Sequence, residues 1–286
     1  MFTIGGGYSD HGTSWGEFSH LSPVSSHDGS FFDFLNSRPT SMRLQTLIVQ
    51  TLSWLVLLAA GLGTPLPAEE NSALKVCLLS GCPTYHSEKS LPPFQEWLEK
   101  NYAVKCVRIA RDGHTFPGLE KLADCDVTFI FFKRMNLEGP ALETFQKHVR
   151  SGKPIVAVRT ASHAVQTWLP FDKEILGGNY QGHYEKDPDT VIAPTDAGRG
   201  HPILKDVQLK SAPGPLYKNT GHADDIAVLL TGSNPGHTEP LAWTREINKG
   251  RVFYTSLGNV ETFEDEQFRR MLANAMFWTA RREVAR

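Results

Sequence analysis

The chain has 286 residues, in which 29 lysine and arginine residues stand against 31 aspartate and glutamate residues, and its formal net charge is −2. This near-neutral composition has no basic stripe of the kind that neutralises the phosphates of a nucleic acid, so no nucleic-acid partner is expected. Residues 69–286 are numerous enough for one domain with a substantial core, and no internal repeat or long linker divides them.

The front of the chain has the composition of a targeting region. Residues 1–41 are rich in Gly, Ser, His and Phe without strand or helix periodicity, which predicts a non-native or disordered extension, with Met42 as the initiator. Residues 42–68 contain a basic start at Arg43, an apolar run over 44–63 and the small Ala68 before acidic Glu69. This order is typical of a cleaved signal peptide. The sequence therefore predicts export to the periplasm or the extracellular space.

A membrane anchor is the alternative for the same run, because about 20 apolar residues can span a bilayer. Three polar residues disfavour this alternative, namely Gln45, Gln50 and Ser53. We therefore expect no stable membrane anchor after cleavage.

Beyond residue 73, apolar runs of strand length alternate with segments of helical character. The runs cover residues 74–79, 104–109, 127–132 and 154–159, and the helical segments include 93–101 and 138–151. This alternation predicts an α/β fold with a parallel sheet and helices on both of its faces. Four cysteines, which could pair in three ways or stay reduced in buried strands, leave the redox state open: Cys77, Cys82, Cys106 and Cys125.

Polar loops follow the four predicted strands, and in parallel sheets ligands bind beyond the carboxyl ends of the strands. The fourth loop contains the richest group, Arg159, Thr160, Ser162 and His163. Arg159 could stabilise an anionic group, His163 could accept a proton, and the hydroxyl groups of Thr160 and Ser162 could bind sugar oxygens. The alternative is that Arg159 pairs with a buried acid and that His163 caps a helix.

A second polar group follows the flexible pair Gly177-Gly178. It combines amide, imidazole and phenol side chains, which suit a polyhydroxylated ligand, in Asn179, Tyr180, Gln181, His183 and Tyr184. His183, His201 and His222 also raise the possibility of a metal, but no HExxH or i, i+4 histidine pair supports one. The sequence thus predicts a small-molecule carbohydrate ligand and no metal or other cofactor.

The end of the chain predicts a hairpin and a helix. Residues 241–246 and 251–256 are rich in aromatic and β-branched side chains and flank the turn sequence Asn248-Lys249-Gly250. Acidic residues then precede apolar positions at helical spacing, from Phe268 to Trp278.

Several of these segments resemble the ThuA-like, or trehalose-utilisation, family. The resemblance lies in Trp243 and Arg245, in the run 250–258, and in the segments 153–165, 176–184 and 200–204. It implies the fold of class I glutamine amidotransferases, a flavodoxin-like three-layer sandwich with a mostly parallel central sheet and a C-terminal antiparallel hairpin plus helix. It also implies that His183 belongs to the site.

The resemblance places Arg159 where an amidotransferase carries its cysteine nucleophile, and a protonated guanidinium cannot attack a carbonyl. Glutamine amidotransfer is therefore excluded. The hairpin is expected to bring further residues to the same edge as Arg159, namely Arg245, Ser256, Asn259 and Glu261. Asn259 stands where many relatives carry histidine, so the general base is sought in His163 or His183, and next in Glu261.

The leading functional hypothesis is an exported protein that binds a sugar or sugar derivative at the carboxyl edge of the sheet and processes it by acid–base chemistry. Hydrolysis, isomerisation and elimination are all compatible with these groups. A non-catalytic sugar-binding or partner-binding module is the first alternative, and a metal-dependent hydrolase is the second. The sequence does not specify the oligomeric state.

Overall fold

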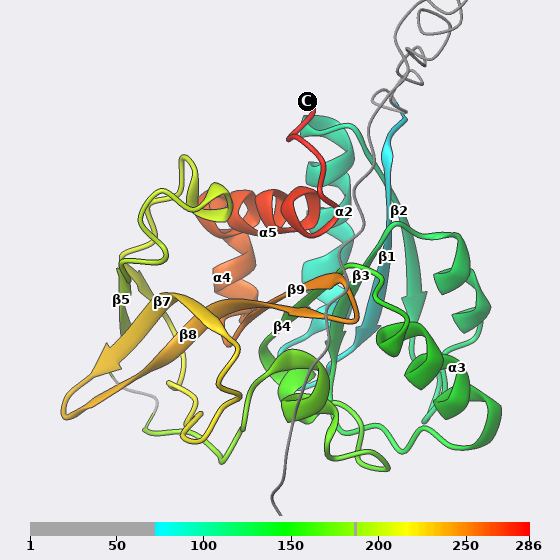
Figure 1. The fold of residues 1–286 in the computed structure, drawn as a ribbon, viewed down its shortest axis with the longest axis horizontal. Coiled ribbons are helices and arrows are strands. Elements are labelled where there is room, and N and C mark those ends of the chain that lie inside the picture. The colour runs from blue at the N-terminus through cyan, green and yellow to red at the C-terminus, as the bar shows by residue number, and fades with distance from the viewer. Residues whose placement is uncertain (1–71, 186–187) are drawn as a thin grey trace, which may run out of the picture. The chain divides into compact units, whose positions relative to one another are not determined.

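The computed structural model describes residues 72–185 and 188–286, and one sheet of nine strands organises them in the order β2-β1-β3-β4-β9-β8-β7-β5-β6 (Figure 1). The predicted extension and signal peptide, residues 1–68, lie outside the described residues. No helix of the described residues is long and apolar enough to cross a membrane.

Half of the sheet is parallel and contains all four strands that the apolar runs predict. These strands are β1 (Leu74–Gly81), β2 (Val104–Ala110), β3 (Val127–Phe132) and β4 (Ile155–Val158), and β9 (Gly250–Thr255) joins them beside β4. β3 and β4 are buried at every position and β1 at all but Lys75, because both faces of the sheet are covered there, whereas the edge strand β2 exposes Lys105 and Arg108. The strands are parallel, so their carboxyl ends share one edge of the sheet.

Helices cover both faces of the parallel half. Val156 and Val158 of β4 belong to a core shared with α2 (Ser87–Asn101), α4 (Val260–Glu264) and α5 (Glu266–Thr279). Ile155 and Ala157 point to the other core, which contains residues of α3 (Gly139–Arg150) and of the 3₁₀-helix η1 (Leu119–Asp124). The predicted α/β class and terminal helix are confirmed, whereas the finer three-layer, flavodoxin-like arrangement stays a prediction.

The other half of the sheet is antiparallel and larger than the single predicted hairpin. It adds β8 (His237–Ile247), β7 (Ala227–Asn234), β5 (Thr190–Pro194) and the two-residue β6 (Ser211–Ala212). The predicted pairing of β8 with β9 is confirmed. Its turn has positive φ at both Asn248 and Lys249, as a two-residue type I′ turn requires.

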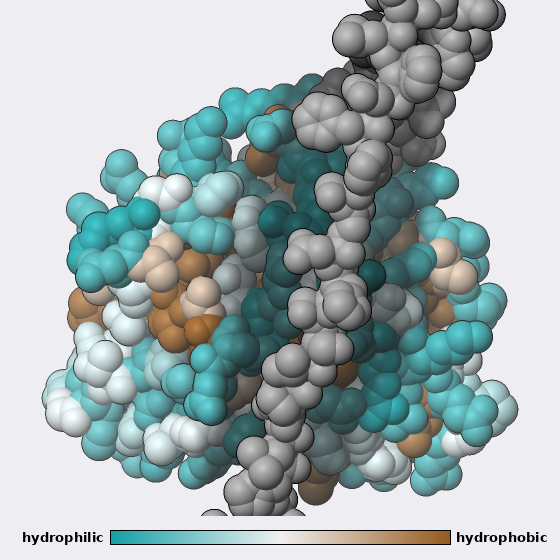
Figure 2. All heavy atoms as spheres, in the orientation of Figure 1, coloured by the Kyte–Doolittle hydropathy of each residue, from teal (hydrophilic) through white to brown (hydrophobic). Residues whose placement is uncertain are grey.

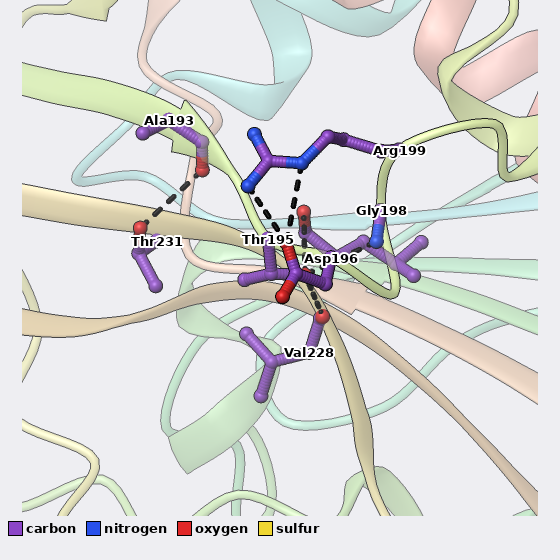
Figure 3. A network of polar contacts seen from close by, with 8 residues as sticks. Ala193, Thr195, Asp196, Gly198, Arg199, Val228 and Thr231 are labelled. Atoms are coloured by element: carbon purple, nitrogen blue, oxygen red, sulfur yellow. Dashed lines mark hydrogen bonds and ion pairs between the residues drawn. The ribbon is translucent and has the colours of Figure 1, made fainter.

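A threonine anchors the loop that leaves β5 (Figure 3). The Thr195 hydroxyl donates to the carbonyl of Val228 at 2.5 Å and accepts from the N–H of Gly198 at 3.1 Å. A Cβ at Gly198 would meet the Leu229 carbonyl at 2.1 Å, so only glycine fits this approach. On the exposed side, Arg199 pairs with Asp196 at 2.7 Å. These contacts fix the start of the long connection between β5 and β7.

The cysteines have two different states. Cys77 of β1 and Cys125 form a disulfide, which selects one of the pairings that the sequence left open. Cys82 and Cys106 are free, and burial raises the pKa of both thiols, that of Cys106 to about 12. Neither thiol is therefore prepared for nucleophilic chemistry.

Candidate functional site

Arg159 occupies a strained turn at the carboxyl end of β4. Its φ is 51°, in the left-handed region, and it begins the short 3₁₀-helix η2 (Arg159–His163). Such a conformation is costly for a residue with a Cβ and persists where the surrounding structure imposes it. Here the Tyr254 hydroxyl donates to the Arg159 carbonyl at 2.8 Å, and both groups are buried. The chain therefore makes a sharp elbow after β4, with arginine at its tip.

The guanidinium of Arg159 is buried, with 2% of the residue exposed. Nη1 donates to the carbonyls of Ser256 at 2.7 Å and Pro215 at 3.3 Å, and Nη2 donates to the Tyr85 hydroxyl at 3.0 Å. Nε has no partner, and no carboxylate of the described residues pairs with this side chain. The alternative in which a buried acid neutralises Arg159 therefore does not hold for the described part of the chain.

Aromatic rings continue from this guanidinium to His163 in what we call the aromatic column, Tyr85, Arg159, Tyr217, Tyr180 and His163. The guanidinium carbon lies 4.4 Å from the Tyr85 ring centroid and 4.5 Å from that of Tyr217. The ring centroids of Tyr217 and Tyr180 are 4.6 Å apart, and those of Tyr180 and His163 are 4.3 Å apart. The column brings together the two predicted polar groups, the loop after β4 and the segment after Gly177-Gly178.

A cavity of about 250 Å³ adjoins the column at Tyr180 and His163. Ser162 and Asn179 also line it, together with Asp172 of the π-helical turn η3 (Asp172–Leu176). The apolar part of its lining includes Trp168 and Phe171. A volume of this size suits a ligand of about one sugar ring.

Asp172 is the acidic group of this cavity, and it is not among the residues that the sequence predicts for the site. Its Oδ2 accepts the Tyr180 N–H at 2.8 Å, whereas its Oδ1 is buried without a partner. Burial raises the pKa of Asp172 to about 7, and the bond from Tyr180 opposes that shift only in part. A Cβ at Gly178 would lie 2.4 Å from Oδ1, so the glycine pair makes room for this carboxyl.

His163 stays neutral near pH 7. Burial lowers its pKa to about 3, and the cations Arg134, Lys133 and Arg159 act in the same direction. Its Nδ1 lies 3.1 Å from the Ser162 hydroxyl, which itself also contacts the Arg159 carbonyl at 3.4 Å. His163 can accept or donate a hydrogen bond here, but it cannot supply the proton of a general acid.

Two predicted binding residues, Asn179 and Gln181, and the predicted catalytic residue His183 are neighbours of Tyr180 in sequence, and backbone carbonyls hold their side chains. Asn179 and Gln181 both donate to the Thr220 carbonyl, at 2.6 and 2.9 Å. The Nδ1 of the exposed His183 lies 2.8 Å from the Tyr184 carbonyl, and His183 pairs with Tyr217 in an isolated bridge. Of these three, only Asn179 lines the cavity.

Three other predicted residues at this edge donate hydrogen bonds to backbone carbonyls. The Thr160 hydroxyl is fully buried and donates to the Phe132 carbonyl at 3.0 Å. The Ser256 hydroxyl donates to the Leu241 carbonyl at 3.4 Å. Asn259 donates to the Pro213 carbonyl at 3.0 Å, while its Oδ1 is buried without a partner. Glu261 is exposed in the first turn of α4.

Arg245 does not lie at this edge, contrary to expectation. It is opposite Val252 at the beginning of β9, and Val252 is in turn level with the first residue of β4. Arg245 donates to Asp225 at 2.8 Å and to the Lys173 and Glu174 carbonyls. It therefore ties β8 to η3, with Asp225 as its acidic partner.

A larger cleft, of about 890 Å³, lies between the 3₁₀-helix η4 (Pro202–Leu204) and the end of α5. Its lining includes Arg251, at the beginning of β9, and thus belongs to the end of the sheet opposite to Arg159. Three of its arginines are in ion pairs, since Arg251 and Arg281 share Glu246 and Arg270 pairs with Glu266. The smaller cavity, which is lined by a carboxyl group, an imidazole and hydroxyl groups, is therefore the candidate functional site.

Within residues 72–185 and 188–286, no three His, Cys, Asp or Glu side chains converge to hold a metal ion. On the face shown in Figure 2, hydrophobic residues form small separate areas among hydrophilic ones. The chemistry available to the described residues at the candidate site thus consists of a carboxyl group, imidazole, hydroxyl groups and fixed cations.

The chain belongs to the ThuA family, described as trehalose utilisation, whose model matches residues 75–279. This membership indicates a carbohydrate-related role. No curated protein matches the chain.

Solved structures show the same fold at low sequence identity. A protein described as ThuA-like from Parabacteroides merdae superposes with a TM-score of 0.60 at 18% identity, over 75% of this chain and 92% of that one. A second ThuA-like protein, from Bacteroides uniformis, gives a TM-score of 0.56 at 20% identity, over 76% and 95%. The cytoplasmic protein STM1381 from Salmonella typhimurium LT2 gives 0.51 at 13%, over 72% and 99%.

Proposed function

We propose that this protein binds a sugar derivative in the cavity beside the aromatic column and processes it by acid–base chemistry, with Asp172 as the proton-transfer group. The observation that carries the proposal is the carboxyl of Asp172, which has a free buried Oδ1 and a pKa raised to about 7 in a cavity of ring size. A carboxyl with this pKa exists in both protonation states near neutrality, as a group that gives and takes protons in turn requires.

The surrounding residues suit a carbohydrate. Tyr180 and His163 offer stacked rings against which the apolar face of a sugar can pack, and the Asn179 amide and Ser162 hydroxyl can bond to its hydroxyl groups. Arg159 provides a fixed positive charge behind Tyr217, which would stabilise negative charge on a reacting oxygen. Hydrolysis, isomerisation and elimination each need such a combination of a proton-transfer group, hydrogen-bonding groups and a fixed positive charge.

The test is turnover of a panel of glucosides, disaccharides and their oxidised derivatives, followed by mass spectrometry with and without an added divalent ion. Asp172→Asn keeps the size of the side chain and should lower turnover about 100-fold or more, with a smaller change in affinity. Asp196→Asn is the matched control, since Asp196 is exposed in a surface ion pair. Equal turnover in wild type and Asp172→Asn would refute this role.

A non-catalytic sugar-binding module is the second candidate. It is favoured by Asn259, which cannot exchange a proton near neutrality, and by the absence of a cysteine at the elbow, where Arg159 stands. Retention of a sugar by wild-type protein without any turnover on the panel would support the module. Turnover that appears only with added metal would support a metal-dependent hydrolase.

We also propose that the protein is exported, on the basis of the basic, apolar and small-residue order of residues 42–68. Cleavage after Ala68 would give a mature chain that begins at Glu69. N-terminal sequencing of the secreted or periplasmic protein tests this proposal, and a chain that retains residues 42–68 would contradict it.

A further inference from the structure

Positive charge gathers at the candidate site without matching acids. Lys133 and Arg134 follow β3, Arg159 follows β4, and all three are near enough to His163 to affect its charge. Lys173 lines the cavity itself. Asp172 is the one carboxylate among the cavity-lining residues of the described chain, and it is only partly ionised near neutrality.

Several arginines elsewhere on the domain are in ion pairs with acidic residues. The ion pairs among residues 72–185 and 188–286 include Arg150 with Glu174 and Arg245 with Asp225. None of them includes Lys133, Arg134, Arg159 or Lys173. The chain as a whole has a net charge of −2, so this edge departs from its average.

Arg159 is the most informative member of this set. A buried charge is costly unless it is paired, and carbonyl and hydroxyl acceptors solvate the guanidinium without neutralising it. Its Nε still lacks an acceptor, and Tyr85, which covers Nη2, is a half-buried residue of the loop after β1. An anion that entered beside Tyr85 would therefore contact a guanidinium whose position is already fixed and whose charge no acidic residue of the described chain neutralises.

The loop after β3 faces the same region. The backbone N–H of Arg134 donates to the His163 carbonyl at 3.2 Å, which holds this loop against η2. The Lys133 ammonium donates to the Thr84 hydroxyl at 2.9 Å, in the loop that also contains Tyr85. Lys133 and Arg134 thus lie on one loop that contacts both the loop after β1 and η2, and both cations are accessible to solvent.

This inference rests on the proposed function. We propose that the sugar derivative bound here carries an anionic group, a carboxylate or a phosphate, which Arg159, Lys133 and Arg134 recognise. The sugar ring occupies the cavity at Tyr180 and Asp172, and the anionic group lies toward the loops after β1 and β3. Neutral sugars lack this contact and bind less tightly.

The test compares matched probes, namely methyl glucoside, methyl glucuronide and glucose 6-phosphate, and the corresponding galactose set. Their dissociation constants are measured with the full chain by isothermal titration calorimetry at constant ionic strength. We expect at least one anionic probe to bind about 10-fold or more tightly than its neutral counterpart, as one charge-assisted contact implies. Comparison of methyl glucuronide with glucose 6-phosphate shows whether the site recognises a carboxylate or a phosphate.

Lys133→Met and Arg134→Gln test the assignment without removing a buried group, and Lys147→Met on the exposed side of α3 is the matched control. The first two variants should lose at least about half of the anionic preference, whereas the control should keep it. Arg159→Gln should abolish the anionic preference. Arg159→Lys keeps the charge and should retain the preference, which would show that the lost charge, and not a loss of folding, causes the effect in Arg159→Gln.

Equal affinity for neutral and anionic probes would overturn this inference and leave the proposed sugar site standing. An anionic preference that survives in both Lys133→Met and Arg134→Gln and in Arg159→Gln would also overturn it, because the anion would then bind elsewhere. Binding of none of the probes would refute both the inference and the sugar site.

Discussion

The hydroxyl group of Tyr254 on β9 donates a hydrogen bond of 2.8 Å to the carbonyl oxygen of Arg159, 95 positions earlier in the chain. Both residues are buried, and the bond holds the left-handed turn that follows β4. The central strand of the sheet thereby controls the backbone at the candidate site.

Tyr254→Phe should lower the free energy of unfolding by about 1 to 3 kcal/mol, because the buried Arg159 carbonyl loses its donor. Urea denaturation measures the change. Tyr102→Phe is the control, since the Tyr102 hydroxyl has no hydrogen-bond partner among the described residues, and it should change stability less. If the two variants were equally stable, the hydrogen bond would not be what holds the turn.

Asp172 should make the protein less stable at higher pH. Its pKa is about 7 in the folded state against 3.8 for the ordinary carboxyl, so the folded state keeps a proton that the unfolded state has lost. Stability therefore falls as pH rises from about 4 to 7 and levels off above, by up to about 4 kcal/mol for this shift.

Asp172→Asn should remove that slope and be more stable than wild type at pH 8. Denaturation midpoints between pH 4.5 and 8.5 would show the difference. Asp196→Asn, at an exposed position, should follow the wild-type curve. A slope that persists in Asp172→Asn would place the titrating group elsewhere.

His163 should remain neutral down to acid pH. Its pKa is lowered to about 3 by burial and by neighbouring cations, so its ring protons should not shift between pH 5 and 8 in an NMR titration. Because the unfolded histidine gains a proton near pH 6.5 and the folded one does not, this group reduces stability as pH falls from 6.5.

His163→Gln identifies its signal and should reduce the acid sensitivity. His148, whose pKa burial lowers to about 4, contributes in the same direction and should show a similarly unshifted signal. A His163 signal that titrates near pH 6.5 would contradict the burial of this ring.

Gly178→Ala should damage the site through a direct clash. A Cβ at this position would lie 2.4 Å from Asp172 Oδ1, so the carboxyl must move, at a cost of about 1 to 3 kcal/mol. Gly113→Ala is the control, because the space at Gly113 is open and only its positive φ, at 56°, is strained, which costs about 1 kcal/mol. Sugar binding, measured by calorimetry, should weaken in Gly178→Ala alone.

The Cys77–Cys125 disulfide closes a loop of 48 residues, for which chain entropy predicts about 4 kcal/mol of stabilisation. A reducing agent should therefore lower the urea midpoint of wild type, and Cys77→Ser should abolish this response. Cys106→Ser should preserve the response, because Cys106 is a free thiol. Equal midpoints with and without reductant would show that the bond adds little.

The sequence was sufficient for β1, β3 and β4 because these strands are buried on both faces and are nearly continuous apolar runs. It was insufficient for β5, which has one buried face and exposes Val191 by 57%. The turn between β8 and β9 was predictable from local chemistry, since Asn and Gly favour such turns.

Arg159 could be found as an arginine at the end of an apolar strand, but Asp172 could not. An aspartate in a short polar–apolar segment has no special signal, and its raised pKa arises only when the loop after η2 and the glycine pair enclose it. The position of Arg245 depends on the register of β8 with β9, which composition does not specify.

The position of β9 has a consequence for how the chain acquires its structure. This strand comes from the last part of the sequence, yet it occupies the middle of the sheet, between β4 and β8. Arg159 donates to the Ser256 carbonyl across 97 positions of sequence. During synthesis the turn at Arg159 therefore lacks its acceptor on Ser256 and its donor on Tyr254 until residues 250–256 have been made. The site is thus completed late, and contacts of such long separation slow folding.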